Sequence, residues 1–215
     1  MLREAIDRAV RRVYEERQQF SSARTSINGN KLPTGFANVG GMGGFRSGTH
    51  NFDMGGGRFD NATEHLSKSG VVNLVFDPFN REYAWNERMI KQVESIGGAD
   101  TVTCFNVLNV IREPEQRSAV IQRCAEVLKP EGVAYFEVYS NPKKYAEVGP
   151  SQTGKDQWQE FRPAKTYIPE IQAFFDDVSI KGKTIIARSP KVAEKPANWY
   201  YDANDETPKQ LKRRW

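Results

Sequence analysis

The chain has 215 residues and a mass of 24.4 kDa, which fits one domain with arms and excludes an assembly of several domains. Hydrophobic residues make up 38% and charged residues 27%, with a mean hydropathy of −0.67, which excludes a wholly disordered chain. No run approaches the roughly 18 apolar residues that cross a bilayer, and the chain opens with MLREAIDRAVRR rather than an apolar leader. We therefore expect a cytoplasmic location and no membrane partner.

The net charge of +4 is unevenly distributed. Residues 1–24 carry a net charge of +2 and residues 188–215 one of +3, which leaves −1 for the residues between them. A basic surface for nucleic acid would therefore lie on the two ends, where the WYY cluster at 199–201 adds rings that can stack on bases. A solvated tail explains the same pattern.

Cysteine and histidine are scarce. Cys104 and Cys124 lie in apolar stretches, where free thiols pack as small hydrophobic side chains, so we expect no disulfide. His50 and His65 form no spaced ligand set with them, and we expect no metal site.

The first 49 residues are predicted to form a helix and a lid-like loop. Leu2, Ile6 and Val10 recur at helical spacing, which predicts an amphipathic N-terminal helix. Residues 21–49 are dense in Gly, Ser, Asn and Thr without a sustained period, which predicts a long loop. Loops of this length are usually functional or disordered, so a lid and a flexible connector are both open.

From residue 50 onward, short apolar runs alternate with helical segments. HNFDM, VVNLVF, DTVTCFNV and GVAYFEVY predict strands, and FDNATEHL, EYAWNERMIKQVESI and EPEQRSAVIQRCAEVL predict the helices between them. A helix over 166–175 and a strand pair in DVSIKGKTIIAR follow. We therefore expect an α/β fold over residues 50–188, a Rossmann-like doubly wound, mostly parallel sheet with an antiparallel C-terminal edge. Residues 189–215 should form a basic, aromatic tail without its own core.

A glycine turn follows the first predicted strand, in NFDMGGGRFD at residues 51–60. Ligands of open parallel sheets bind at this edge, and Gly55, Gly56 and Gly57 leave the backbone open to one. The helix that follows offers free amide donors. A tight turn without a ligand would need the same residues.

Asp77 closes the next predicted strand, 24 residues after Asp53. This is close to the interval of about 20 residues at which a carboxylate receives the two hydroxyls of a ribose. An Asp-Pro pair equally begins a turn or caps a helix. Together with the glycine turn, Asp77 favours an adenosyl ligand.

Asp53 separates the possible adenosyl ligands by charge. A carboxylate just before the glycines opposes the pyrophosphate of a dinucleotide, and Asp60 occupies the third glycine position of the dinucleotide pattern. S-adenosylmethionine carries an ammonium and a sulfonium without phosphate, so both acids favour it. The sequence therefore indicates methyl transfer.

Residues 50–188 resemble the class I S-adenosylmethionine-dependent methyltransferases. DMGGG is similar to the first motif of that family, Asp77 to the acidic residue that closes its second strand, and ADTVTCFNVLNVI to its fourth-strand motif. LKPEGVAYFEVY is similar to its fifth strand and the turn before it. More narrowly, RTSIN, DPFN, FNVLNVI and KGKTIIA look like the small, unassigned methyltransferases of bacteriophage genomes, which implies the host cytoplasm.

The resemblance implies a role for each motif residue. Asp53 would hold the methionine ammonium, Gly55 to Gly57 would admit methionine and ribose, and Asp77 would take the ribose diol. The family usually has a third strand whose polar end recognises the adenine amino group. Because the segment between Asp77 and Asp100 has room for one helix and little else, we expect that strand to be missing or reduced.

Three further residues are implied to lie at the cofactor. Pro78 and Phe79 would line an adenine face, and Asn106 would border both cofactor and acceptor. Phe79 equally fits the core, and Asn106 equally fits a cap of the next segment.

The sequence indicates neither the methyl acceptor nor a catalytic residue. Methyl transfer is a direct displacement, which needs a base only if the acceptor is protonated. The D/N/S-P-P-Y/F element of amino-methylating nucleic-acid enzymes is replaced by FNVLN at 105–109, and neither cysteine follows the proline of a carbon-5 cytosine enzyme. A small molecule and a nucleic acid are both open as acceptors, and the oligomeric state is not indicated.

We expect the acceptor pocket beyond the fifth family strand and beside the N-terminal loop. The candidate residues there are Arg24, Asn28, Lys31, Tyr145, Trp158, Arg162, Lys165 and Tyr167. Three other functions remain open at this point: an NAD(P)-dependent oxidoreductase, a noncatalytic cofactor-binding protein, and an adapter that works through its arms.

Overall fold

The computed structural model describes residues 31–140, 151–154 and 157–191, with the backbone alone for 151–154, 157 and 158. The predicted N-terminal helix lies outside the described residues, as does the tail beyond residue 191. The elements of the described part are α2 (Thr34–Gly41), β1 (His50–Met54), α3 (Asn61–Ser67), β2 (Val72–Phe76), α4 (Tyr83–Ser95), β3 (Ala99–Phe105), η1 (Leu108–Val110), α5 (Pro114–Glu126), β4 (Leu128–Glu137), β5 (Ser151–Gly154), β6 (Gln157–Gln159), η3 (Ala164–Tyr167), α6 (Ile168–Gln172), β7 (Phe175–Lys181) and β8 (Thr184–Pro190).

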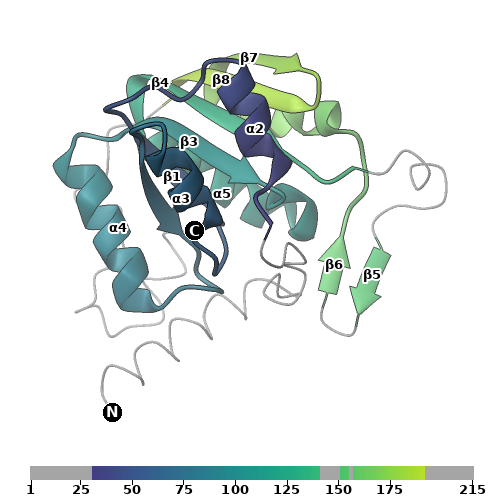
Figure 1. Ribbon diagram of the computed structural model, residues 1–215. Helices are drawn as coiled ribbons and strands as arrows, with labels where there is room; N and C mark the ends of the chain where they lie inside the picture. Colours follow the sequence, from purple (N-terminus) through teal and green to yellow (C-terminus); the bar gives the residue numbers. More distant parts are fainter. Residues whose placement is uncertain (1–30, 141–150, 155–156, 192–215) are drawn as a thin grey trace.

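Six strands form one sheet in the order β2-β1-β3-β4-β8-β7 (Figure 1). The first four are parallel, and β8 runs antiparallel to both β4 and β7. The predicted mostly parallel sheet with an antiparallel C-terminal edge is therefore confirmed. A separate antiparallel pair, β5 and β6, follows β4. Across the described ranges, the helices are too short or too polar to cross a membrane.

Alternation along each strand sends side chains to two faces of the sheet. One face carries large apolar residues such as Phe52, Leu74 and Phe136, which pack against apolar residues of α4, α5 and α6. Ile90 of α4 and Ile121 of α5 are fully buried in this layer. Burial on both faces explains why the strands read as nearly continuous apolar runs.

The opposite face is covered by α2 and α3. Helix α2 corrects the predicted loop at residues 34–41, whereas residues 21–30 of that loop lie outside the described residues. Residues 34–41 are helical although TGFANVGG has weak helix propensity. Phe36 and Val39 are buried against side chains of β3, β4 and β8, and this packing outweighs the local propensity. At Gly35 a Cβ would come within 2.7 Å of the Phe105 ring, so the glycine permits the helix to approach the sheet.

The chain passes from β2 through α4 directly to β3, on the other side of β1. Residues 72–105 are all described, and they contain no strand between β2 and β3. The expected absence of the third family strand is thus confirmed. As a result, β2 is an edge of the described sheet.

Candidate functional site

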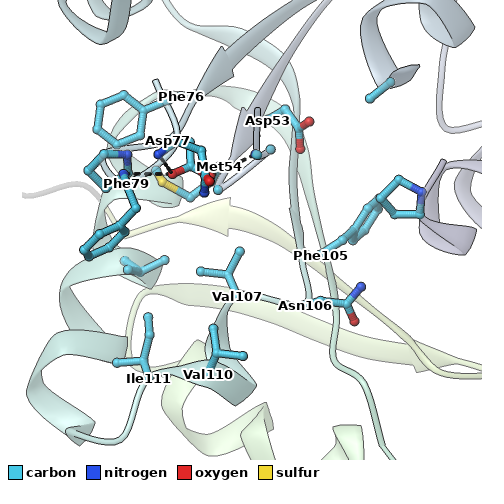
Figure 2. Close-up of a pocket in the computed structure, with 18 of the residues that line it drawn as sticks. Asp53, Met54, Phe76, Asp77, Phe79, Phe105, Asn106, Val107, Val110 and Ile111 are labelled. Carbon is cyan, nitrogen blue, oxygen red and sulfur yellow. Dashed lines mark hydrogen bonds between the residues drawn. The ribbon is translucent and has the colours of Figure 1, made fainter. Parts of the chain in front are cut away.

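A cavity of about 200 Å³ opens at the carboxyl ends of β1, β2 and β3 (Figure 2). This is the edge at which open parallel sheets bind ligands, where the loops after neighbouring strands diverge. All eight residues predicted to bind a cofactor line it: Asp53, Gly55, Gly56, Gly57, Asp77, Pro78, Phe79 and Asn106. The structure therefore brings together residues from three separate segments.

The backbone of the glycine turn after β1 adopts a conformation that is rare for residues with a side chain. Gly55 and Gly57 have φ values of 73° and 77°, in the left-handed region that glycine adopts without strain. The N–H of Gly55 donates to the carbonyl of Phe76 at 2.7 Å, which ties the turn to the end of β2. A Cβ on Gly56 would overlap the carboxylate of Asp53 and come within 2.9 Å of Val75. Backbone and buried carboxylate are therefore in direct contact.

Asp53 is a buried carboxylate at the end of β1, with 3% of its surface exposed. Its Oδ1 accepts a hydrogen bond from the Thr103 hydroxyl at 2.9 Å, and that hydroxyl accepts one from Asn51 Nδ2 at 2.9 Å. Burial raises the pKa of Asp53 to about 7, although hydrogen bonds from Thr103 and Asn73 act in the opposite direction. Within the described residues Asp53 forms no ion pair, and the Arg81 charge lowers its pKa less than these hydrogen bonds do. A buried carboxylate without an ion pair can be stabilised by a cationic ligand.

Asp77 is also buried, and its carboxylate organises both loops. Oδ1 accepts from the backbone N–H groups of Phe79 and Asn80, each at 2.9 Å. Oδ2 accepts from the N–H of Gly57 at 2.9 Å and from the Asn80 side chain at 3.1 Å. The capping role that the sequence left open is therefore real, and it places the carboxylate beside the glycine turn.

Arg81 connects the same two loops and was not anticipated from the sequence. Its Nε donates to the carbonyl of Gly57 at 2.8 Å, and a terminal nitrogen pairs with Asp60 at 2.7 Å. The guanidinium lies 5.0 Å from the centre of the Trp85 ring. Arg81 therefore holds the outer end of the glycine turn against the start of α4.

Phe79 and Asn106 lie at opposite sides of the cavity in Figure 2. Phe79 and Pro78 are half-buried and outside the apolar core, as an adenine face requires. Asn106 directly follows β3 with φ = 60°, and its N–H donates to the carbonyl of Glu137 at 2.8 Å. Strained conformations of this kind gather at functional sites, and asparagine tolerates this one better than most residues.

The apolar walls of the cavity were not predicted. Phe36 of α2 packs edge-on against Phe105 of β3, with ring centres 5.0 Å apart, and both line the cavity. Asn38 of α2 donates to Glu137 Oε1 at 2.7 Å, which fixes the helix over the sheet. On the other side, apolar residues follow β3 in the segment FNVLNVI; they are Val107, Val110 and Ile111.

Of the predicted acceptor-binding residues whose side chains the structure describes, one lines the cavity and three do not. Lys31 lines the cavity, whereas Arg162, Lys165 and Tyr167 do not. Tyr167 is fully buried in the core, with the Arg162 guanidinium 3.6 Å from its ring centre. Arg162 also pairs with Glu170 at 2.5 Å, so its charge is used within the fold. Arg24, Asn28 and Tyr145, together with the side chain of Trp158, lie outside the described residues.

Neither cysteine lines the cavity. Cys104 and Cys124 are free thiols with no exposed surface, and a hydrogen bond between them, together with burial, raises the pKa of Cys104 well above its usual range. Within the described ranges, no group of three or more His, Cys, Asp or Glu side chains is arranged to hold a metal ion.

Known methyltransferases are similar to this chain, one over part of its sequence and another in its fold. The chain is 32% identical over 97 residues to a ubiquinone biosynthesis O-methyltransferase of Shewanella halifaxensis. The matched stretch covers 45% of this chain and 36% of that protein, so the chain spans only about a third of its length. No profile of a known protein family matches the chain.

The solved structure is that of Burkholderia thailandensis 1,6-didemethyltoxoflavin-N1-methyltransferase, with bound 1,6-didemethyltoxoflavin and S-adenosylhomocysteine. It superposes with a TM-score of 0.50 over 73% of this chain and 76% of that one, at 15% identity. The chain therefore has the Rossmann-like fold of the class I S-adenosylmethionine-dependent methyltransferases, with the third strand of that fold missing.

Proposed function

We propose that this protein is an S-adenosylmethionine-dependent methyltransferase. The observation that carries the proposal is the buried carboxylate of Asp53, which lies against Gly56 in the same cavity as Asp77. A cationic amino acid group would stabilise the ionised carboxylate, whereas a pyrophosphate against the same backbone would be repelled. The site thus favours a sulfonium nucleoside over a dinucleotide.

The residues of the cavity suit the parts of that cofactor. Asp53 would bind the methionine ammonium, and the glycine turn would leave room for the methionine chain and ribose. Asp77 would accept hydrogen bonds from the ribose hydroxyls. Its longest present hydrogen bond comes from the half-buried Asn80 side-chain amide at 3.1 Å, and this amide can turn away so that a ribose hydroxyl takes its place. Pro78 and Phe79 would cover an adenine face.

When bound, S-adenosylmethionine supplies an electrophilic methyl group. The chain has to align the acceptor with it and keep water away, and the apolar wall of Phe36, Phe105 and Val107 suits that task. Catalysis by alignment needs no charged base unless the acceptor is protonated, and we assign no catalytic residue.

The relatives support the proposal in a limited way. Both the Shewanella protein and the Burkholderia protein are methyltransferases by name, and the second was solved with S-adenosylhomocysteine. For this chain the acceptor is proposed only as a small molecule or a nucleic acid. The narrower likeness to bacteriophage methyltransferases, the cytoplasmic location, and the division into residues 1–49, 50–188 and 189–215 are part of the same proposal.

Calorimetric titration with S-adenosylhomocysteine and with NADH tests the cofactor. We expect binding of the first and none of the second; the reverse result would establish an oxidoreductase-like site and reject the proposal. Incubation with a donor carrying a labelled methyl group and fractionated cell extract then tests the activity. Label should enter DNA, RNA, protein or a small molecule, and a binding protein without turnover would transfer none.

A further inference from the structure

Asn109 is a buried amide that lines the cavity without a hydrogen-bond partner. It lies in η1 with 1% of its surface exposed, and neither Nδ2 nor Oδ1 is hydrogen-bonded within the part of the chain that the structure describes. Its backbone is well held, since its carbonyl accepts a hydrogen bond from the N–H of Glu160 at 2.7 Å. Buried amides are almost always paired, so this one has unused capacity for a ligand.

The position of Asn109 in the fold separates it from the proposed cofactor residues that follow β2. Asp77 and Phe79 follow β2, whereas η1 follows β3, and the sheet order places β1 between these two strands. The bond from Glu160 joins η1 to the segment after β6, which itself comes after β4. Gln159 at the end of β6 lines the same cavity. Asn109 thus lies on the side of the cavity away from the end of β2.

The cavity lining that Asn109 shares is partly amide and partly aromatic, and it also includes the cationic side chains of Lys31 and Arg123. Asn106, three residues earlier, and Gln159 add two further amides to the cavity lining, and Phe36 and Phe105 add aromatic rings. An amide offers a donor beside an acceptor, so its complement is an edge that carries an N–H next to a C=O. An anion would oppose Oδ1, and a cation would oppose Nδ2.

We propose that Asn109 determines specificity for a planar heterocyclic acceptor, and that it binds the adjacent N–H and C=O of that acceptor through Oδ1 and Nδ2. This assignment rests on the proposed methyltransferase function, because it treats the cavity beside the cofactor residues as the acceptor subsite.

The test uses the full chain with saturating S-adenosylhomocysteine and the probe 2-pyridone, whose N–H adjoins its C=O. N-methyl-2-pyridone is the matched probe that lacks the donor. By ligand-observed NMR titration we expect the wild-type protein to prefer 2-pyridone by about tenfold, the effect of one well-formed buried hydrogen bond. Asn109→Leu should abolish the preference and leave the affinity for S-adenosylhomocysteine within about twofold.

Asn109→Asp provides a second variant if the leucine variant fails to fold. It keeps the shape but offers acceptors alone, so at slightly acidic pH it should prefer the 2-aminopyridinium cation to 2-pyridone. A wild-type protein that does not distinguish the two pyridones, or a preference that survives both substitutions, would overturn the assignment. So would a tenfold loss of cofactor affinity in Asn109→Leu, since the amide would then face the cofactor.

The experiment distinguishes a failure of the Asn109 assignment from a failure of the proposed methyltransferase function. Wild-type protein that binds no S-adenosylhomocysteine rejects the methyltransferase, whatever the pyridones do. The pyridone comparison can then be repeated without cofactor, where loss of the preference in Asn109→Leu would still identify the amide as the binding group.

Discussion

The backbone N–H of Gly57 donates a 2.9 Å hydrogen bond to Oδ2 of Asp77. One carboxylate therefore supports the glycine turn after β1 and the turn after β2 together, because Phe79 and Asn80 donate to its other oxygen. A ligand that lies across the two loops meets a surface that is already organised. Preorganisation of this kind reduces the entropy lost on binding.

Asp77→Ala removes this support, and we expect it to weaken S-adenosylhomocysteine binding by about 1.5–3 kcal/mol, the range for hydrogen bonds to a charged group. It should also lower the free energy of unfolding, because the half-buried N–H groups of Gly57, Phe79 and Asn80 lose their acceptor. Asp77→Asn keeps one acceptor oxygen, so its cofactor affinity and its free energy of unfolding should lie between those of the wild-type protein and Asp77→Ala. Calorimetry and urea denaturation measure both effects, and unchanged affinity in Asp77→Ala would contradict the assigned role.

A pair of glycine substitutions tests how closely the turn approaches Asp53. In Gly56→Ala the added methyl group meets the buried Asp53 and Val75, so we expect a loss of stability of about 1–3 kcal/mol and cofactor affinity reduced at least about tenfold. Gly40→Ala is the matched control, since a Cβ there meets nothing within 4 Å. Differential scanning calorimetry and ligand titration should leave that control at wild-type affinity, with stability unchanged or raised by about 0.4–1 kcal/mol. Wild-type behaviour of Gly56→Ala would mean that the turn is looser than the structure indicates.

The strands and the glycine turn were predictable because their signals are local. An apolar run bounded by turn residues, and a carboxylate followed by three glycines, can be read within ten residues of chain. The missing third strand was also predictable, from the shortness of the segment between Asp77 and Asp100. These features position all eight predicted cofactor residues at one cavity.

Features that depend on long-range contacts were missed. Helix α2 has a glycine-rich sequence, and it is stabilised by packing of Phe36 on Phe105, which no local pattern reveals. Arg81 bonds to a carbonyl 24 residues away. Conversely, Arg162 lies in a polar segment that suggests a binding site, yet its charge is neutralised by Glu160 and Glu170 within the fold.

The raised pKa of Asp53 predicts a pH dependence of binding. With a pKa of about 7 in the free protein, the carboxyl is ionised in only about 3% of molecules at pH 5.5 and in most of them at pH 8. The ammonium of the ligand requires the ionised carboxylate of Asp53. The dissociation constant of S-adenosylhomocysteine should therefore be about 30-fold larger at pH 5.5 than at pH 8. Asp53→Asn should bind weakly with a nearly flat profile, and a flat wild-type profile would exclude Asp53 as the titrating group.

The same shift predicts an effect on stability of the free protein. The pKa of Asp53 is higher in the folded state than its ordinary value of 3.8, so the folded state binds more protons between the two values. The contribution of Asp53 to stability is therefore present below about pH 4 and is lost as the pH rises toward about 7, by up to about 1.4 kcal/mol per pH unit. Denaturant titrations from pH 5 to 7.5 should show this decline in the wild-type protein, and subtraction of the Asp53→Asn profile should isolate it.

Arg81 and Arg88 both pack on the Trp85 ring, so variants of the two can distinguish the effect of ring packing from the effect of supporting the glycine turn. The guanidinium groups of Arg81 and Arg88 lie 5.0 and 5.3 Å from the centre of the Trp85 ring. Arg81 alone of this pair also bonds to Gly57 and Asp60. We expect Arg81→Met to weaken S-adenosylhomocysteine binding by about 1–3 kcal/mol and Arg88→Met to change it less than about twofold.

Hydrogen exchange of the amides at residues 55–60 gives a second measurement on the same variants. Exchange should accelerate in Arg81→Met because residues 57–60 lose their three bonds to the Arg81 side chain, and it should not change in Arg88→Met. Arg81→Lys keeps the charge without the forked geometry, so it should recover only part of the affinity. If both methionine variants lose affinity equally, the effect comes from the Trp85 ring, and Arg81 does not hold the glycine turn in its binding conformation.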